Sequence, residues 1–303
     1  MAAAFTPGRL WQMLTERTRQ AKASGHLHSI ETNACPVSEN GIEFVVRVAA
    51  NLKRKAEDKK KRAADFNPFL PPEPELTVCE LSDTHRAVLN KFNVVDHHLL
   101  IVTRAFEDQE RLLTQADFEA LWQCLGEYPS LGFYNGGAAA GASQKHKHLQ
   151  LVPLPLYPNS AGNAAPYPFA SLLEIDAPPL QMMTLMQWPF LHRWCGIPAD
   201  WSDAAPATAA RNSLRIYLEM LADCGIESVF REGGTWQSAP YNLLMTRHWM
   251  LLVPRSREFS QGISVNALGY LGSLFVTDPE ALQRLSDIGP LRLLDEVSQP
   301  KRV

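Results

Sequence analysis

Residues 131–154 constrain the fold more than any other part of the chain. An apolar segment that ends at Asn135 runs into a glycine-rich loop, and a second apolar segment follows over residues 146–154. In the second segment, apolar residues alternate with polar ones, which is typical of a β-strand with one face in a core. Prolines end the alternation. The sequence therefore predicts two strands joined by a loop of small residues.

The rest of the chain predicts short strands in pairs and a few helices. Apolar or β-branched segments predict strands over residues 42–49, 85–92, 98–103, 242–245 and 249–253. Helical spacing of apolar residues and capping patterns predict helices over residues 8–23, 114–125 and 209–222 and from residue 277 onward. Strands that follow each other directly favour antiparallel pairing. We therefore expect an α+β fold with an antiparallel sheet and flanking helices.

Length and composition are those of an ordinary globular protein. The chain has 303 residues, of which 46% are hydrophobic and 20% charged, which excludes a disordered or coiled-coil chain. At roughly 150 residues per domain, this length predicts two domains or one duplicated fold. The second half again predicts paired strands and helices, but it shows no obvious sequence repeat of the first half.

The charge of the chain is unevenly distributed. A formal net charge of −3 gives no global reason to bind nucleic acid or an anionic membrane. Residues 53–62 differ, because they carry a net charge of +5 and leave −8 for the remainder. Such a run is usually a solvated loop or helix face. The alternative is an arm that helps to hold a polyanionic substrate.

The terminus and the cysteines indicate a cellular compartment. The N-terminal sequence lacks the basic segment and apolar core of a signal peptide, and no window approaches about 18 uninterrupted apolar residues. The five cysteines are far apart and form no C-x-x-C pair. We expect a cytoplasmic protein with reduced, mostly buried cysteines.

Three polar side chains share one face of the strand over residues 146–154. His146, His148 and Gln150 alternate with residues that point the other way. The preceding loop adds small residues, whose backbone N–H groups can approach an anion closely, together with Ser143 and Gln144 as neutral donors. This combination favours a phosphate site over the polar face of an ordinary edge strand.

A histidine in such a site suits nucleotidyl transfer. An imidazole with a pKa near ~6.5 is largely neutral at pH 7, so one ring nitrogen can attack phosphorus while the other is oriented by an acceptor. Gln150 could then hold the phosphoryl oxygens as charge develops. Histidine pairs also bind metals, but no cysteine or carboxylate cluster nearby completes a ligand set.

The segment GASQKHKHLQ, with Asn135 upstream, resembles the active-site signature of the diadenosine tetraphosphate (Ap4A) phosphorylases, also called ATP adenylyltransferases. These enzymes belong to the histidine-triad superfamily, in the branch near galactose-1-phosphate uridylyltransferase. Supporting blocks occur in matching order: SGHLHSI at 24–30, FNPF at 66–69, LNKF at 89–92, HLLIVT at 98–103, YNLLMT at 241–246 and PR at 254–255. The resemblance implies a histidine-triad-like antiparallel sheet in which two similar halves form one composite fold.

The resemblance also implies a reaction. Ap4A and inorganic phosphate would become ATP and ADP, with His148 as the nucleophile that takes AMP from the α-phosphorus. His146 would orient or polarise the site, and Gln150 would contact the transferred phosphoryl group. Residues 1–160 would form the catalytic half with the H-x-H-x-Q motif, and residues 161–303 would close the nucleotide site. The substrate-binding residues implied by the resemblance are Lys55, Asn90, Lys91, Asn135, Gly141, Ala142, Ser143, Gln144, Tyr241, Asn242, Thr246 and Arg247.

Partners and cofactors follow from the same resemblance. The expected partners are a dinucleoside polyphosphate, ATP, ADP and inorganic phosphate, with neither nucleic acid nor membrane, and a monomer or small homo-oligomer is expected. No tightly bound cofactor is expected, and Mg²⁺ would enter only with the polyphosphate. Zinc, found in some relatives, is not expected because the C-x-x-C that supplies thiolates is absent.

Other activities and other residues stay open as alternatives. The chain could hydrolyse the same substrate with water, transfer a nucleotide from a nucleoside-diphosphate-sugar or to a hexose 1-phosphate, or be a non-catalytic nucleotide sensor. His26 and His28 form a second H-x-H without the glycine loop, and His97 and His98 begin an apolar strand. We expect these four histidines to be structural, and Trp249 to lie in the core.

The basic run provides the first prediction. Lys53, Arg54 and Lys55 lie beside the block that resembles the substrate-binding region, and which of the three contacts phosphate stays open. Replacing Lys55 by Ala should raise the KM for Ap4A, because a compact polyanion needs local positive charge. Replacing Lys60 by Ala should change the KM little, and equal effects of the two substitutions on KM would contradict this division of the run.

Overall fold

The computed structural model describes residues 3–49, 66–157, 165–175 and 178–301. Lys55 and the whole basic run over residues 53–62 lie outside the described residues.

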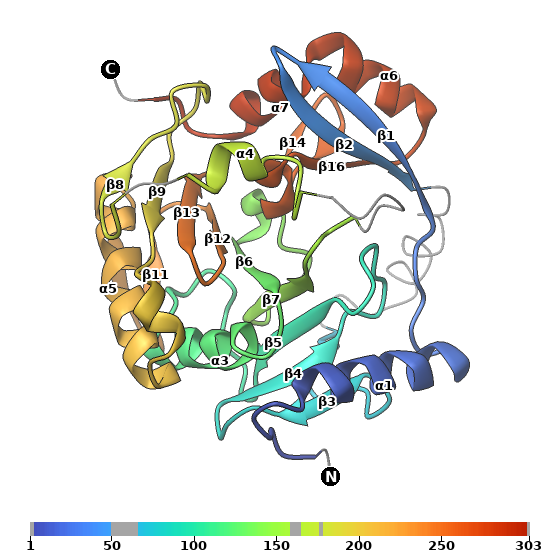
Figure 1. Ribbon diagram of the computed structural model, residues 1–303, viewed down its shortest axis with the longest axis vertical. Helices are drawn as coiled ribbons and strands as arrows, with labels where there is room; N and C mark the ends of the chain where they lie inside the picture. The colour runs from blue at the N-terminus through green and yellow to red at the C-terminus, as the bar shows by residue number, and fades with distance from the viewer. Residues whose placement is uncertain (1–2, 50–65, 158–164, 176–177, 302–303) are drawn as a thin grey trace.

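A nine-stranded sheet forms the centre of the molecule (Figure 1). Its strands, in spatial order, are β3 (Thr77–Glu80), β4 (His85–Leu89), β5 (Leu99–Thr103), β7 (His148–Pro153), β6 (Ser130–Gly136), β12 (Tyr241–Met245), β13 (Trp249–Pro254), β9 (Arg193–Gly196) and β8 (Met182–Met183). Every neighbouring pair is antiparallel. The two halves of the chain meet where β6 pairs with β12, so one sheet runs through both.

A smaller sheet joins the halves a second time. It consists of β1 (Thr32–Glu39), β2 (Ile42–Ala49) and β16 (Ser273–Val276), and β16 pairs with β2 in parallel. Two short ribbons complete the strands: β10 (Ser228–Arg231) with β11 (Gly234–Gln237), and β14 (Phe259–Ser260) with β15 (Ile263–Ser264). Residues near the two ends of the chain are thus held in one sheet.

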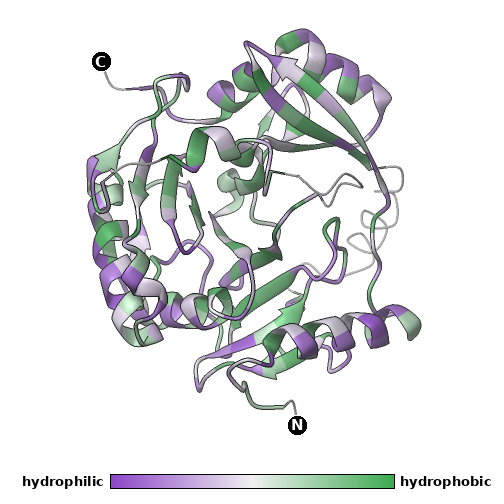
Figure 2. Ribbon diagram, viewed as in Figure 1, coloured by the Kyte–Doolittle hydropathy of each residue, from purple (hydrophilic) through white to green (hydrophobic). Residues whose placement is uncertain are grey.

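Helices flank the central and the smaller sheet (Figure 1). They are α1 (Leu10–Ala23), α3 (Gln115–Leu125), α4 (Ala170–Leu173), α5 (Pro206–Asp223), α6 (Pro279–Ile288) and α7 (Pro290–Val297), with short 3₁₀ turns η1 (Ala138–Ala140), η2 (Ala199–Ser202) and η3 (Ala267–Leu271). Figure 2 shows hydrophilic and hydrophobic residues alternating along α1 and α6, while the central strands are mainly hydrophobic. None of the helices in the described part of the chain has the length and apolarity that crossing a membrane requires.

Alternation along the strands produces two hydrophobic cores. Leu149 and Leu151 of β7 pack in one core with the buried residues of α3 and α5. Val152 lies in the other core, with residues of β2, α4 and η3. Since successive strand residues point to opposite faces, His148 and Gln150 must lie on the face of β7 that is turned away from α3.

The expected α+β architecture with an antiparallel sheet and flanking helices is confirmed, and only details of the elements differ. The strand predicted from His146 begins at His148, and the one predicted to reach Phe92 ends at Leu89. Strand β1 was not predicted, because its sequence, TNACPVSE, contains a proline, exposes half of its side chains and fully buries none. It forms because β2 pairs with it along its whole length.

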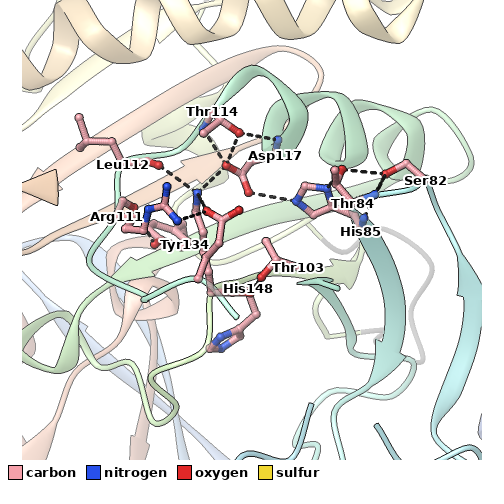
Figure 3. Close-up of polar contacts among 12 residues, drawn as sticks. Ser82, Thr84, His85, Thr103, Arg111, Leu112, Thr114, Asp117, Tyr134 and His148 are labelled. Carbon is pink, nitrogen blue, oxygen red and sulfur yellow. Dashed lines mark hydrogen bonds and ion pairs between the residues drawn. The ribbon is translucent and has the colours of Figure 1, made fainter. Parts of the chain in front are cut away.

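Helix α3 is tied to the H-x-H segment by a buried ion pair. Thr114 and Asp117 form the predicted capping box, and Asp117 also accepts a hydrogen bond from His85 (Figure 3). The Nζ of Lys147 lies 2.7 Å from Asp117 Oδ2, and both side chains are fully buried. Burial alone would oppose ionisation of Asp117, but Lys147 and His85 hold the pKa of its carboxyl well below the usual range.

Lys147 therefore anchors the backbone between His146 and His148 on the face opposite the two histidines. Its ammonium group also donates to the carbonyl of Leu112, 3.0 Å away. In Figure 3 the ring of His148 points away from Asp117 and the capping box. A lysine inside the motif thus holds the strand in place and does not face the substrate side.

Asp117→Asn should destabilise the protein by about 3 kcal/mol, because it leaves the buried ammonium of Lys147 with only the more distant and more exposed carboxylate of Glu107, 3.4 Å away, as counter-charge. Urea unfolding near pH 7 measures this cost. Asp278→Asn is a suitable control, since Asp278 caps α6 through a half-buried side chain that Asn can replace and is part of no buried ion pair in the described residues. An equally small effect of both substitutions would contradict the anchoring role of the ion pair.

Candidate active site

A cavity of about 300 Å³ lies on the face of the central sheet that carries His148 and Gln150, within the size range of small-molecule sites. Strands β5, β6 and β7 and the glycine-rich loop contribute to its wall. Five residues of the second half also line it, and no motif had indicated them: Glu258, Ser264, Asn266, Leu268 and Phe275. Both halves of the chain thus enclose one cavity.

The ring of His148 is held by a single hydrogen bond to the backbone. Its Nδ1 lies 2.8 Å from the carbonyl oxygen of His146. A carbonyl can only accept, so Nδ1 must carry the proton and Nε2 must be the unprotonated nitrogen. Within the described residues, Nε2 has no hydrogen-bond partner. Burial lowers the pKa of His148 to about 4, and the bond to the His146 carbonyl opposes this only in part.

His146 is fixed from both sides and does not line the cavity. Its Nε2 donates to the carbonyl oxygen of Thr103 at 2.8 Å, and its Nδ1 accepts from Asn67 at 2.9 Å. The Asn67 amide is itself oriented, because its oxygen accepts from the backbone of Phe69. Burial lowers the pKa of His146 as well. His146 therefore orients the site through its backbone carbonyl.

Gln150 lines the cavity and is oriented by His98, which we had expected to be a structural strand-entry residue. His98 Nε2 lies 3.0 Å from Gln150 Oε1, and Asn90 Nδ2 lies 3.2 Å from His98 Nδ1. An amide oxygen only accepts, so His98 donates to it, and the amide nitrogen of Gln150 donates to no other group among the described residues. His98 directly precedes β5, as expected of a strand-entry residue, and it also orients Gln150, a partner 52 residues away.

Asn135 and Asn242 form a second oriented pair. The Oδ1 of Asn135 accepts from Asn242 Nδ2 at 2.8 Å and from the backbone of Ala267 at 3.1 Å. The buried Arg255 in turn donates to Asn242 Oδ1 at 2.6 Å. Asn135 lines the cavity, and its Nδ2 donates to no partner in the described part of the chain. Asn242 thus acts behind Asn135.

The glycine-rich loop lies close to the second half of the chain. Gly141 has a φ of +89°, and a Cβ there would come within 3.0 Å of Asn266 and of the carbonyl of Val265. Only glycine combines this positive φ with the lack of a Cβ that would collide with residues 265 and 266. Gly141, Ser143 and Gln144 line the cavity, whereas Ala142 does not and binds the carbonyl of Gly137 through its backbone.

Asn90 and Lys91 are also brought to the cavity. The Lys91 ammonium is paired there with Glu73, at 2.8 and 3.0 Å from the two carboxylate oxygens. The wall beside them is apolar, and the residues that form it are Phe69, Leu76, Val88, Leu89, Phe92 and Val95. The cavity therefore has an apolar side and a side rich in neutral hydrogen-bond donors.

Besides His146, Ala142 and Asn242, three more of the sequence-predicted residues do not line the cavity. Tyr241 is fully buried, and its hydroxyl lies 2.6 Å from that of Tyr217. Thr246 and Arg247 follow the end of β12 that pairs with Gly132, the far end from Asn135. The segment YNLLMT at 241–246 that precedes Arg247 contains Asn242, which is connected to the cavity through its hydrogen bond to Asn135.

His28, His97 and Trp249 make structural contacts, as expected. His28 stacks on Phe92, with ring centroids 5.5 Å apart, and His97 lies against Thr18 and Trp11. Trp249 is 1% exposed. Groups of three or more His, Cys, Asp or Glu that could hold a metal ion do not occur among the described residues.

The lowered pKa of His148 yields a pH prediction. A histidine with a pKa near 4 is neutral throughout pH 5.5–8. Its ring nitrogen resonances, followed by NMR in the free protein, should therefore not titrate in this interval, and Nδ1 should stay protonated. An inflection of the His148 resonances between pH 6 and 7 would contradict the burial and tautomer described above.

Comparisons with known proteins identify the family of the chain. The Ap4A phosphorylase N-terminal domain family matches residues 1–174, and the ATP adenylyltransferase C-terminal domain family matches residues 186–300. Diadenosine 5',5'''-P1,P4-tetraphosphate phosphorylase 2 of Saccharomyces cerevisiae is 27% identical over 316 residues, which cover 92% of this chain and 90% of the relative. Protein APA1 of the same yeast is 24% identical over 310 residues, covering 93% and 91%.

Solved structures show the same fold. The complex of yeast Ap4A phosphorylase Apa2 with AMP has a TM-score of 0.78 at 25% identity and covers 99% of this chain and 100% of that one. The complex of Apa2 with Ap4A has a TM-score of 0.77 at 24% identity and covers both chains fully. With more than half of its length matched by the N-terminal domain family alone, this chain belongs to the Ap4A phosphorylase family.

Proposed function

We propose that this protein is a nucleotidyltransferase that converts Ap4A and inorganic phosphate into ATP and ADP through a covalent adenylyl-histidine on His148. The proposal rests on the hydrogen bonding and the protonation of the His148 imidazole. Its Nδ1 proton is committed to the His146 carbonyl, and burial keeps the ring neutral with Nε2 available. Membership of the Ap4A phosphorylase family supports the same reaction.

The first half-reaction transfers the adenylyl group to the enzyme. The Nε2 lone pair forms a bond to the α-phosphorus, the bond from that phosphorus to the bridging oxygen breaks, and ATP leaves. The ring gains positive charge, which the His146 carbonyl stabilises through Nδ1–H. The amide groups of Gln150 and Asn135 can donate to the non-bridging oxygens as charge shifts onto them.

The second half-reaction regenerates the ring. An oxygen of inorganic phosphate forms a bond to the adenylyl phosphorus, the bond to Nε2 breaks, and ADP leaves. A ring whose pKa has been lowered is a better leaving group than an ordinary imidazole. The same burial that keeps the nucleophile unprotonated therefore helps the transfer to phosphate.

The two sides of the cavity suit the two parts of an adenylate. The apolar wall between Leu76 and Val95 offers contacts for a nucleobase, and the loop over residues 141–144 offers backbone and side-chain donors for phosphates. Among the predicted binding residues, we propose Asn90, Asn135, Gly141, Ser143 and Gln144 as substrate contacts. Lys91 would act together with Glu73, and Lys55 is proposed from the sequence alone.

The division of labour between the halves follows from the cavity lining. We propose that residues 1–160 carry the chemistry and residues 161–303 close the site, because His148 lies in the first part while Glu258 and Asn266 line the cavity from the second. Mg²⁺ would enter with the polyphosphate. All five cysteines are unpaired, which supports a reducing, cytoplasmic location.

Three alternatives predict different reactions. A hydrolase would cleave Ap4A equally fast in phosphate-free buffer. A sugar-nucleotide transferase would use a hexose 1-phosphate better than inorganic phosphate. A non-catalytic sensor would bind nucleotides without turnover, which a neutral histidine with an available Nε2 at the cavity does not favour.

Trapping the intermediate tests the proposal. Ap4A labelled at the α-phosphate, mixed with the protein without acceptor and quenched in base, should leave label on the peptide that contains His148. ATP release should equal the amount of labelled protein. His148→Ala should lose the label while it still binds AMP. A wild-type protein that releases ATP without labelled peptide would contradict the covalent mechanism.

His192 provides a matched control within the same chain. Its Nδ1 lies 2.9 Å from the carbonyl of Phe190, two residues before it, and burial lowers its pKa to about 4, as for His148. However, its Nε2 accepts from the backbone of Leu185 and it does not line the cavity. His192→Asn should therefore retain the label on His148.

A further inference from the structure

The pairing of β6 with β7 stops just before the catalytic histidine. The register runs from Ser130 opposite Pro153 to Phe133 opposite Gln150. If it continued, Asn135 would stand opposite His148, but these two residues are not paired. His148, the proposed nucleophile, and Asn135, a proposed phosphate donor, therefore lie opposite each other where the strand pairing is interrupted.

The side chain of Gln109 occupies the interruption. Its Oε1 accepts from the backbone N–H of His148 at 2.9 Å, and its Nε2 donates to the carbonyl of Asn135 at 2.9 Å. A longer bond of 3.2 Å joins Nε2 to the carbonyl of His148. One side-chain amide thus takes the place that a backbone hydrogen bond would have in the ladder.

The bridge is built into the fold. Gln109 is 2% exposed, its backbone N–H donates to the carbonyl of Lys145 at 2.7 Å, and its own carbonyl accepts from the hydroxyl of Tyr134. Both ends of its amide are satisfied in one orientation only. Removal of this buried amide would take away the hydrogen-bond partner of backbone groups on two strands.

We propose that Gln109 is a positioning residue for adenylyl transfer, which sets the relative placement of His148 and Asn135 by bridging their strands. Without the amide, the His148 N–H and the Asn135 carbonyl either stay unpaired or pair directly. Either change moves the imidazole relative to the phosphate donors, and misplacement of a nucleophile by about 1 Å costs about a hundredfold in rate. This role rests on the proposed function.

Gln109→Met tests the bridge, with Gln237→Met as the matched control. Gln237 is also a buried glutamine whose amide donates to a carbonyl of β6, that of Gly136 at 2.7 Å, but it does not reach His148. Rates of His148 adenylylation in a single turnover, KM for Ap4A and AMP dissociation constants would be measured for both variants and the wild type.

The expected result is a split between rate and binding. Gln109→Met should slow adenylylation by about tenfold to a hundredfold and leave KM and AMP binding within about threefold. Gln237→Met should keep all three quantities within about threefold of wild type. Equal adenylylation rates of the two variants, or a change confined to KM, would overturn the bridging role.

A second variant covers the case in which Gln109→Met does not fold. Gln109→Glu has the same shape, and its ionised carboxylate keeps an acceptor for the His148 N–H but loses both donors, so its rate is compared at a pH above the carboxyl pKa measured in the variant. It should show the same loss of rate, and a wild-type rate would overturn the proposal. Wild-type protein that forms no adenylyl-His148 would instead refute the proposed function, so the two failures are distinguishable.

Discussion

The hydrogen bond from His148 Nδ1 to the carbonyl of His146 is the interaction on which the site depends. It fixes the tautomer, so that Nε2 is unprotonated. Its acceptor is a neutral carbonyl, which raises the pKa of the ring less than a carboxylate would. Burial then keeps the ring neutral. His192 has the same backbone contact, but its Nε2 accepts from the backbone N–H of Leu185.

The surrounding structure holds that carbonyl in place. The ring of His146 is locked between Thr103 and Asn67, and the next residue, Lys147, reaches Asp117 on the opposite face of the strand. Within H-K-H, the two histidines thus lie on the cavity side of the strand, and the lysine lies on the opposite side in a buried ion pair. Its middle lysine serves stability, and its two histidines serve orientation and chemistry.

Much of this could be predicted from the sequence, because it depends on local pattern. The capping box at Thr114, the strand pairs and the shared face of His146, His148 and Gln150 follow from spacing alone. The contacts of His98 with Gln150 and of Gln109 with two strands could not, because they join residues 52, 39 and 26 positions apart. Thr246 and Arg247 do not line the cavity, and a block that resembles a substrate-binding region does not by itself show which end of its strand lies near the cavity.

The central claim is that the adenylyl group passes through His148 and is not transferred directly to phosphate. The configuration at a chiral α-phosphorus, introduced as a phosphorothioate in Ap4A and read in the product ADP analogue, measures this most directly. Each in-line displacement inverts the phosphorus, so two successive displacements predict overall retention. Overall inversion would show a single direct transfer and would contradict the account.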